Sequence, residues 1–233
     1  MWNDGGGIPK TSLKLVWTDQ EQNEEFFIPD VVLMGSPNTP YPLSWKKHQE
    51  ENNLHKEDIN MKTIYFAGGC FWGMEAFMKK LPGVAETTAG YANGRTENPT
   101  YQEVCSNTTG HAETVKVVYD PEQISLELLL KAFFKVVDPT ELNRQGGDVG
   151  EQYRNGIYYV DVEDRPVIEA AIEKEKQKYA NPVVTECMPL ACFYDAEEYH
   201  QDYLDKNPAD YCHINLLDAD EFIAEEMGEE SIC

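Results

Sequence analysis

The stretch TIYFAGGCFWG, residues 63–73, joins two patterns that together set the local fold of the chain. Its first half is rich in β-branched and aromatic residues, which favour an extended strand. Two glycines then interrupt that strand. Over residues 71–81, apolar side chains recur at three- and four-residue intervals, which is typical of a helix with one buried face. The sequence therefore predicts a strand, a tight turn and a helix that stops at Pro82-Gly83.

Cys70 stands at the point where the predicted strand becomes a helix. The first turn of a helix has unpaired backbone N–H groups and the positive end of the helix dipole. This setting favours a thiolate, so we expect the pKa of the Cys70 thiol to lie below that of a free cysteine. The alternative, from position alone, is that Cys70 is a small buried apolar residue.

Strand and helix patterns alternate along the chain from residue 61. Strands are predicted at 84–91, 112–119, 156–160 and 183–186, and helices at 126–137, 164–179 and 195–206. The order β-α-β-β-α-β between residues 61 and 160 is that of the split βαβ unit. We therefore expect an α+β fold, with a ferredoxin-like split βαβ sandwich core and additional strands, helices and long loops.

Composition divides the chain into three parts. Residues 1–60 contain a proline-rich loop and a polar, charged stretch, and we expect them to be an N-terminal extension of unknown role. Residues 61–215 hold the alternating pattern and form the predicted main domain. Residues 216–233 are rich in Asp and Glu and are predicted to be an acidic C-terminal tail.

The charge of the chain excludes some classes of partner. There are 42 acidic and 19 basic residues, a formal net charge of −23. Nucleic-acid binding is disfavoured because phosphate contacts need clustered Lys and Arg, and an anionic membrane surface is disfavoured for the same reason. No apolar run approaches the roughly 18 residues of a membrane span, and the first residues do not resemble a secretory signal.

Six cysteines are too few and too irregularly spaced for a disulfide scaffold. Because the chain has no C-x-x-C pair, neither a zinc ribbon nor a thioredoxin-type motif is supported, and we expect no metal site. Cys187 and Cys192, with four residues between them including Pro189, are only weak evidence for one. A few working thiols in a reducing compartment fit this pattern, so we expect a cytoplasmic protein.

Five motifs occur in a fixed order: GCFWG at 69–73, NPTYQEVC at 98–105, GHAE at 110–113, DVGEQYR at 148–154 and EYHQ at 198–201. Together they resemble the peptide methionine sulfoxide reductase A family. The resemblance implies an oxidoreductase that returns the S epimer of methionine sulfoxide, free or in proteins, to methionine, and so repairs oxidised proteins under oxidative stress. The catalytic domain would be residues 61–215. The family often has His and Thr where Val149 and Glu151 stand, a difference that bears on the local loop geometry.

The resemblance assigns roles to the groups that would act on the sulfoxide. Cys70 would be the nucleophile, and Glu113, whose pKa burial would raise, would protonate the departing oxygen. Tyr101 and Tyr153 match the family's hydroxyl donors to that oxygen. Asp148 matches a residue that orients the site, although an aspartate beside two glycines also suits a simple turn.

The resemblance also implies a substrate pocket and a second thiol. Phe71 and Trp72 would hold the S-methyl group of the substrate. Cys70 would become a sulfenic acid, and Cys212 would resolve it as a Cys70–Cys212 disulfide. Cys233 would be placed to pass that disulfide onward. Electrons would then come from thioredoxin or a similar dithiol, so no bound cofactor is expected.

The residues leave other readings open. His200 either shapes the site or is a structural histidine, and Cys105 more simply fills structure. A thiol peroxidase also uses a sulfenic acid and a resolving thiol, but it has no need of Glu113 with two tyrosines. An inactive module that binds oxidised methionine is the third interpretation, and the presence of Cys70, Glu113 and Cys212 argues against it.

Overall fold

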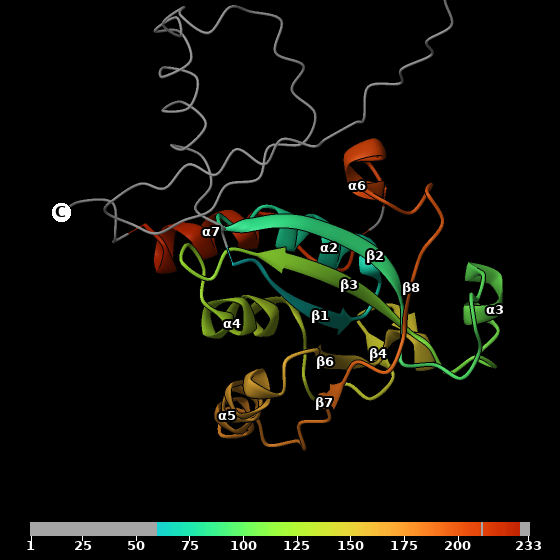
Figure 1. Ribbon diagram of the computed structural model, residues 1–233, viewed down its shortest axis with the longest axis horizontal. Helices are drawn as coiled ribbons and strands as arrows, with labels where there is room; N and C mark the ends of the chain where they lie inside the picture. The colour runs from blue at the N-terminus through green and yellow to red at the C-terminus, as the bar shows by residue number, and fades with distance from the viewer. Residues whose placement is uncertain (1–59, 211, 229–233) are drawn as a thin grey trace, which may run out of the picture. The chain divides into compact units, whose positions relative to one another are not determined.

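A computed structural model describes residues 60–210 and 212–228. Within these residues, six strands form one mixed sheet, and Figure 1 shows its strongly twisted centre. The strand order across the sheet is β7 (Glu186–Pro189), β6 (Asn155–Tyr159), β1 (Lys62–Gly68), β3 (Ala112–Tyr119), β2 (Val84–Ala92) and β8 (Phe193–Asp195). All neighbouring strands run antiparallel except β6 and β7, which are parallel.

Strand β1 lies inside the sheet and has both faces covered. Phe66 stands opposite Val115 on β3 and Ile157 on β6. Because side chains alternate along a strand, Ile64 and Phe66 join the main apolar core, whereas Tyr65 and Ala67 join a smaller cluster on the opposite face. This double burial explains why the segment is apolar at nearly every position.

The main core lies between the sheet and four helices. These are α2 (Phe71–Lys79), α4 (Leu126–Val136), α5 (Arg165–Lys176) and α7 (Leu217–Glu226). Ser125 caps α4 as its sequence suggests, since its side chain accepts a hydrogen bond from the Leu128 amide at 3.2 Å. Phe133 on α4 stacks on Phe66 of β1, with ring centroids 5.2 Å apart.

The predicted order over residues 61–160 appears as β1, α2, β2, β3, α4 and β6. Short elements that the sequence analysis did not predict interrupt it between β2 and β6. They are α3 (Tyr101–Cys105), β4 (Arg144–Gln145), β5 (Asp148–Val149) and the 3₁₀ turn η1 (Glu151–Tyr153). A further 3₁₀ turn, η2 (Val162–Asp164), precedes α5. The strand predicted at 183–186 instead spans Glu186–Pro189 as β7.

The helix predicted at 195–206 is wrong for most of its length. Only α6 (Tyr203–Lys206) is helical, and β8 ends at Asp195. The side chain of Gln201 bonds to both backbone groups of Ala89 on β2, at 2.9 Å each, and Asp202 has a left-handed φ of 51°. These bonds to a distant strand hold residues 196–202 in turns and outweigh their local helical pattern.

Helix α7 lies within the stretch predicted to be an acidic C-terminal tail. Its residues Ala219 and Phe222 are buried in the main core, and its acidic face pairs with α4, where Lys135 lies 3.4 Å from Glu225. Residues 1–59 and Cys233 lie outside the described residues, so their predicted roles stay predictions. In the described part of the chain, no helix has the length and apolar character needed to cross a membrane.

Phe222→Ala should lower the free energy of unfolding by about 3–5 kcal/mol, because it removes a buried aromatic ring and leaves a cavity beneath α7. Urea unfolding followed by circular dichroism measures this change. Leu217→Ala, at an exposed position of the same helix, is the matched control and should cost less than about 0.5 kcal/mol. Equal effects of the two substitutions would contradict the burial of α7.

Candidate active site

Cys70 is the N-cap residue of α2, directly after β1 and the two glycines. The second glycine, Gly69, has a φ of +85°, which side chains rarely allow. A Cβ atom there would lie 2.6 Å from Gln145 Cβ and 3.0 Å from His213 Nε2. Glycine at 69 therefore lets two distant segments close around the reactive turn.

The pKa of the Cys70 thiol is raised, which contradicts the expectation of a lowered value. Burial is the largest cause, followed by the carboxylate charge of Glu113, and the carboxylate of Asp148 adds to it. The backbone N–H of Trp72 acts in the opposite direction, as the helix argument requires. Desolvation and two nearby carboxylates together outweigh the helix N-terminus.

Glu113 is fully buried on β3 beside the same turn. Its Oε2 atom accepts a hydrogen bond from the Phe71 amide at 3.1 Å, and its Oε1 atom has no partner among the described residues. Burial raises the pKa of this carboxyl to about 8; the Phe71 N–H opposes the rise and Asp148 adds to it. Glu113 is therefore protonated at neutral pH and has one oxygen free to donate a hydrogen bond.

The two predicted tyrosines reach this site from separate loops. Tyr101 begins α3, where Thr100 forms a capping box, and its ring centroid is 6.5 Å from that of Phe71. Tyr153 ends η1. For both phenols the pKa is raised, first by burial and next by the charge of Glu113, so both lie within the field of this carboxyl.

An aromatic cluster forms one side of the site. The ring of Trp72 stacks on Tyr203 with centroids 3.7 Å apart, and its Nε1 donates to His200 Nδ1 at 3.0 Å. The buried ring of His200 is 5.1 Å from Phe71 and 4.5 Å from Tyr101. His200 thus packs within the predicted substrate pocket. The sequence analysis missed Tyr203, because its position depends on the turns at 196–202.

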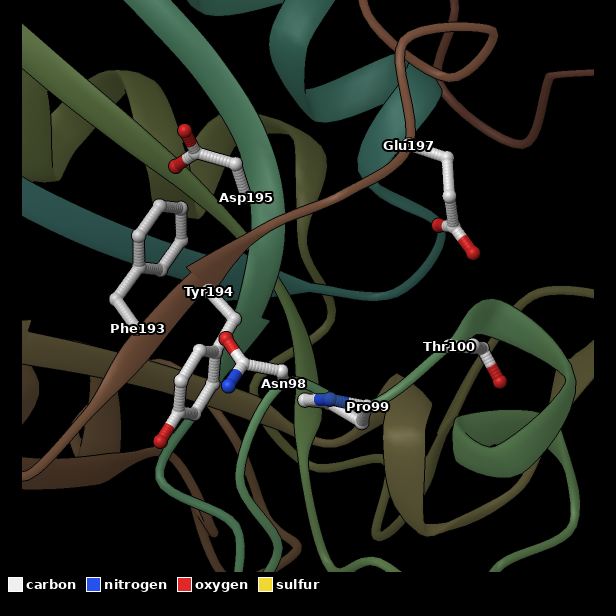
Figure 2. Close-up of a pocket in the computed structure, with 7 residues that line it drawn as sticks. All are labelled: Asn98, Pro99, Thr100, Phe193, Tyr194, Asp195 and Glu197. Atoms are coloured by element: carbon white, nitrogen blue, oxygen red, sulfur yellow. The ribbon is translucent and has the colours of Figure 1, made fainter.

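Glu197 is a second residue that the sequence analysis missed. Its carboxylate accepts from the Tyr101 amide at 2.9 Å and from the Tyr91 hydroxyl at 2.8 Å, so it ties α3 to β2. It also lines a pocket of about 490 Å³, which Figure 2 shows with Thr100 and Glu197 on one side and Phe193 on the other. Neither Cys70 nor Glu113 lines this pocket, so it is distinct from the reactive turn.

Cys212 lies against the first turn of α2. A Cβ atom at Gly73 would lie only 2.6 Å from its Sγ atom, so the second glycine of the GCFWG motif makes room for this sulfur. The Ile214 amide donates to Cys212 Sγ at 3.3 Å. Burial raises the pKa of the Cys212 thiol, and the charge of Cys212 in turn raises the pKa of Cys70. The two thiols are therefore neighbours.

Asp148, on β5, faces the residue after Cys212. Its Oδ2 atom is 3.7 Å from His213 Nδ1, and His213 Nε2 is 3.2 Å from the Gly68 carbonyl oxygen. The charge of Asp148 also acts on both Cys70 and Glu113. Asp148 therefore lies near both groups, and its predicted role in orienting the site stays a prediction.

The other described cysteines differ in their distance from this site. Cys105 lies at its edge, where it contributes to the raised pKa of Tyr101, whereas Cys187 is on β7 and Cys192 is 3.8 Å from the Gly94 carbonyl oxygen. Across residues 60–210 and 212–228, His, Cys, Asp and Glu form no cluster suited to a metal ion. The site instead joins two thiols, a protonated carboxyl, two phenols and an aromatic wall.

Known proteins resemble this chain over about two thirds of its length. A family model described as peptide methionine sulfoxide reductase matches residues 62–231. The chain belongs to this family. A relative named peptide methionine sulfoxide reductase MsrA from Clostridium acetobutylicum is 60% identical over 154 residues, which are 66% of this chain and 95% of the relative. One of the same name from Alkaliphilus metalliredigens is 58% identical over 156 residues, 67% of this chain and 99% of the relative.

Two solved structures resemble the fold of this chain. Reduced Mxr1 from Saccharomyces cerevisiae matches with a TM-score of 0.65 and 38% identity, covering 68% of this chain and 93% of that one. Methionine sulfoxide reductase A of Corynebacterium diphtheriae matches with a TM-score of 0.61 and 39% identity, covering 67% of this chain and 79% of that one. These similarities agree with the α+β class predicted from the sequence.

Glu113→Gln should gain stability relative to the unsubstituted protein as pH rises from about 4.5 to 8. The native carboxyl keeps its proton up to about pH 8, whereas in the unfolded chain it loses the proton near its ordinary value of 4.5. The unsubstituted protein therefore loses stability across this pH range. The Gln variant does not lose stability in this way, because its side chain has no carboxyl proton.

Urea unfolding at several pH values measures the difference between the two proteins. It should be constant below pH 4.5 and grow towards pH 8. Glu122→Gln, at an exposed glutamate, is the control and should show no such trend. A difference for Glu113→Gln that stays flat with pH would show that this carboxyl is ionised in the native protein.

Proposed function

We propose that this protein is an oxidoreductase that reduces methionine-S-sulfoxide, free or in proteins, to methionine through a thiol, sulfenic acid and disulfide cycle. One observation carries the proposal: the protonated, half-paired carboxyl of Glu113 bonds to the helix turn that bears Cys70. A thiol alone is consistent with many reactions. A thiol beside a buried acid suits the removal of an oxygen that must leave as water.

In the first step, Cys70 Sγ attacks the sulfoxide sulfur while the oxygen gains negative charge. The free oxygen of Glu113 donates its proton there, and the Tyr101 and Tyr153 hydroxyls supply further hydrogen bonds. The raised pKa values of both phenols keep them protonated and therefore able to donate. Methionine is released, the sulfoxide oxygen passes to Cys70 as the hydroxyl of a sulfenic acid, and the proton that the Cys70 thiol loses restores Glu113.

The aromatic wall selects the substrate. The rings of Phe71 and Trp72 would hold the S-methyl group, and His200 and Tyr203 fix both rings by packing and hydrogen bonding. With the oxygen directed to Glu113 and the methyl group to the wall, only one sulfoxide epimer presents its sulfur to Cys70. This arrangement supports selection of a single epimer, and the family resemblance identifies it as the S epimer.

In the second step, Cys212 attacks the Cys70 sulfenic acid, and a disulfide and water form. The room that Gly73 leaves for Cys212 Sγ, one turn from Cys70, supports this pairing over one with Cys187 or Cys192. Thioredoxin or a similar dithiol would then reduce the bridge. No step in this cycle needs a bound cofactor.

Two other functions fit the site less well. A thiol peroxidase would use the two thiols, but it gives no role to the wall of Phe71 and Trp72. An inactive module that binds oxidised methionine would keep the wall but has no need of paired thiols. Asp148 remains assigned to orienting the site, because its charge acts on both thiols and on Glu113.

The fold and boundaries support the same assignment. The order β6-β1-β3-β2, with α2 and α4 packed in one core, supports a ferredoxin-like split βαβ unit. The catalytic domain is proposed to span 61–215, between the N-terminal extension and the acidic C-terminal part. The cytoplasmic setting and the relay by Cys233 stay predictions.

Cys70→Ser should abolish reduction of methionine-S-sulfoxide with dithiothreitol, because a serine hydroxyl is rarely ionised and cannot form a sulfenic acid. Chromatography of released methionine measures the activity. Cys192→Ser is the matched control and should remain active. The R epimer and hydrogen peroxide should be poor substrates of the unsubstituted protein. Substantial turnover by Cys70→Ser, or faster reduction of peroxide than of sulfoxide, would exclude the proposal.

Cys212→Ser should still release about one methionine per enzyme without reductant, because attack by Cys70 does not need the second thiol. Turnover with thioredoxin should be lost, since no disulfide forms. Mass spectrometry of the oxidised, unsubstituted protein should find a Cys70–Cys212 bridge, and Cys187→Ser should leave that bridge intact. Normal turnover of Cys212→Ser with thioredoxin would instead indicate direct reduction of the sulfenic acid.

A further inference from the structure

The residue that follows the second thiol is held more tightly than the thiol itself. The side chain of His213 is only 5% exposed and lies between the Gly68 carbonyl and the Asp148 carboxylate. Gly69 allows this approach, since a Cβ atom there would crowd His213 Nε2 at 3.0 Å. His213 therefore links the segment that carries Cys212 to the turn that carries Cys70.

The contacts of His213 fix its tautomer. The Gly68 carbonyl oxygen can only accept a hydrogen bond, so Nε2, 3.2 Å away, carries the ring proton. In the neutral ring Nδ1 is then a bare acceptor, and it faces Asp148 Oδ2 at 3.7 Å. Neither of these two buried atoms has a hydrogen-bond partner among the described residues. The lone pairs of these two atoms thus face each other. One added proton would convert the two side chains into an ion pair.

We propose that the Asp148–His213 pair accepts the proton of Cys212 as that thiol attacks the Cys70 sulfenic acid. This inference rests on the proposed function. In this step the sulfur–sulfur bond forms and the bond from Cys70 sulfur to its hydroxyl oxygen breaks. The Cys212 sulfur is oxidised and the Cys70 sulfur is reduced. The proton from Cys212 goes first to the pair and then leaves with the hydroxyl group as water.

The charges around the pair fit this role. The titratable groups within the field of Asp148 are Cys70, Glu113, Tyr153 and Cys212, in addition to His213. Burial lowers the pKa of His213 below its ordinary value of 6.5, against the opposing effect of Asp148. The ring is therefore neutral at neutral pH and its Nδ1 atom is free to take a proton. The carboxylate beside it then stabilises the imidazolium.

His213→Gln tests the proposal, because glutamine can still donate to the Gly68 carbonyl but cannot hold the added proton. Reduced protein is mixed with one equivalent of methionine-S-sulfoxide without reductant. Chromatography follows methionine release, and alkylation with mass spectrometry follows the Cys70–Cys212 bridge. At neutral pH the variant should release methionine at a rate within about threefold of the unsubstituted protein. Its bridge should form roughly a hundredfold more slowly, the lower end of acid–base catalysis.

The pH profile separates proton transfer from a merely structural role. The pKa of His213 lies below its ordinary value of 6.5. Once the pH falls below that lowered pKa, His213 holds a proton before the reaction, so the advantage of the unsubstituted protein over His213→Gln should shrink. Asn215→Ala, on the same segment, is the control, and its rate relative to the unsubstituted protein should not vary with pH.

Three results would overturn the inference: equal bridge formation in His213→Gln, an equal slowing of methionine release, or a rate ratio that does not change with pH. Failure of the unsubstituted protein to release methionine would instead refute the proposed function. The two failures are therefore distinguishable in one experiment.

Discussion

The hydrogen bond from the Phe71 amide to Glu113 is the interaction on which the site depends. It joins the first turn of α2 to β3, a strand held on both sides by β1 and β2. Because Glu113 belongs to the sheet, it cannot move without disturbing the strand register, in which it stands opposite Tyr91. The bond also keeps one carboxyl oxygen paired and the other free, so the same contact fixes both the position and the chemistry of the acid.

Local signals were enough to predict much of the fold and part of the site. The strand–turn–helix at residues 63–81 follows from residue pattern and glycine placement alone, because both act over a few neighbouring residues. The same holds for the cap at Ser125. The burial of Glu113 could be predicted because the residue lies in an apolar strand. The family resemblance supplied the remaining candidate residues, and Tyr101 and Tyr153 among them lie within the field of Glu113.

Features that depend on distant contacts could not be predicted. The raised pKa of Cys70 arises first from burial and then from Glu113 and Asp148, which the fold brings from other segments to the helix N-terminus. The irregular course of residues 196–202 depends on bonds from Gln201 to β2. The burial of Phe222 reflects a partner surface on α4 that no local charge pattern reveals. In each case tertiary contacts outweigh a clear local preference.

The segment that bears Cys212 is short and fixed at both ends. The Asp202 carboxylate accepts a hydrogen bond from Lys79, and the Asp202 amide donates one to Glu75; both partners are on α2. At the other end, Phe222 anchors α7 in the core. Only the ten residues from 207 to 216 link α6 to α7. A short tether of this kind keeps a thiol at high effective concentration near its target, so capture within the molecule outpaces encounter with solutes. A sulfenic acid formed at Cys70 would therefore be short-lived, which protects it from irreversible oxidation to the sulfinic acid.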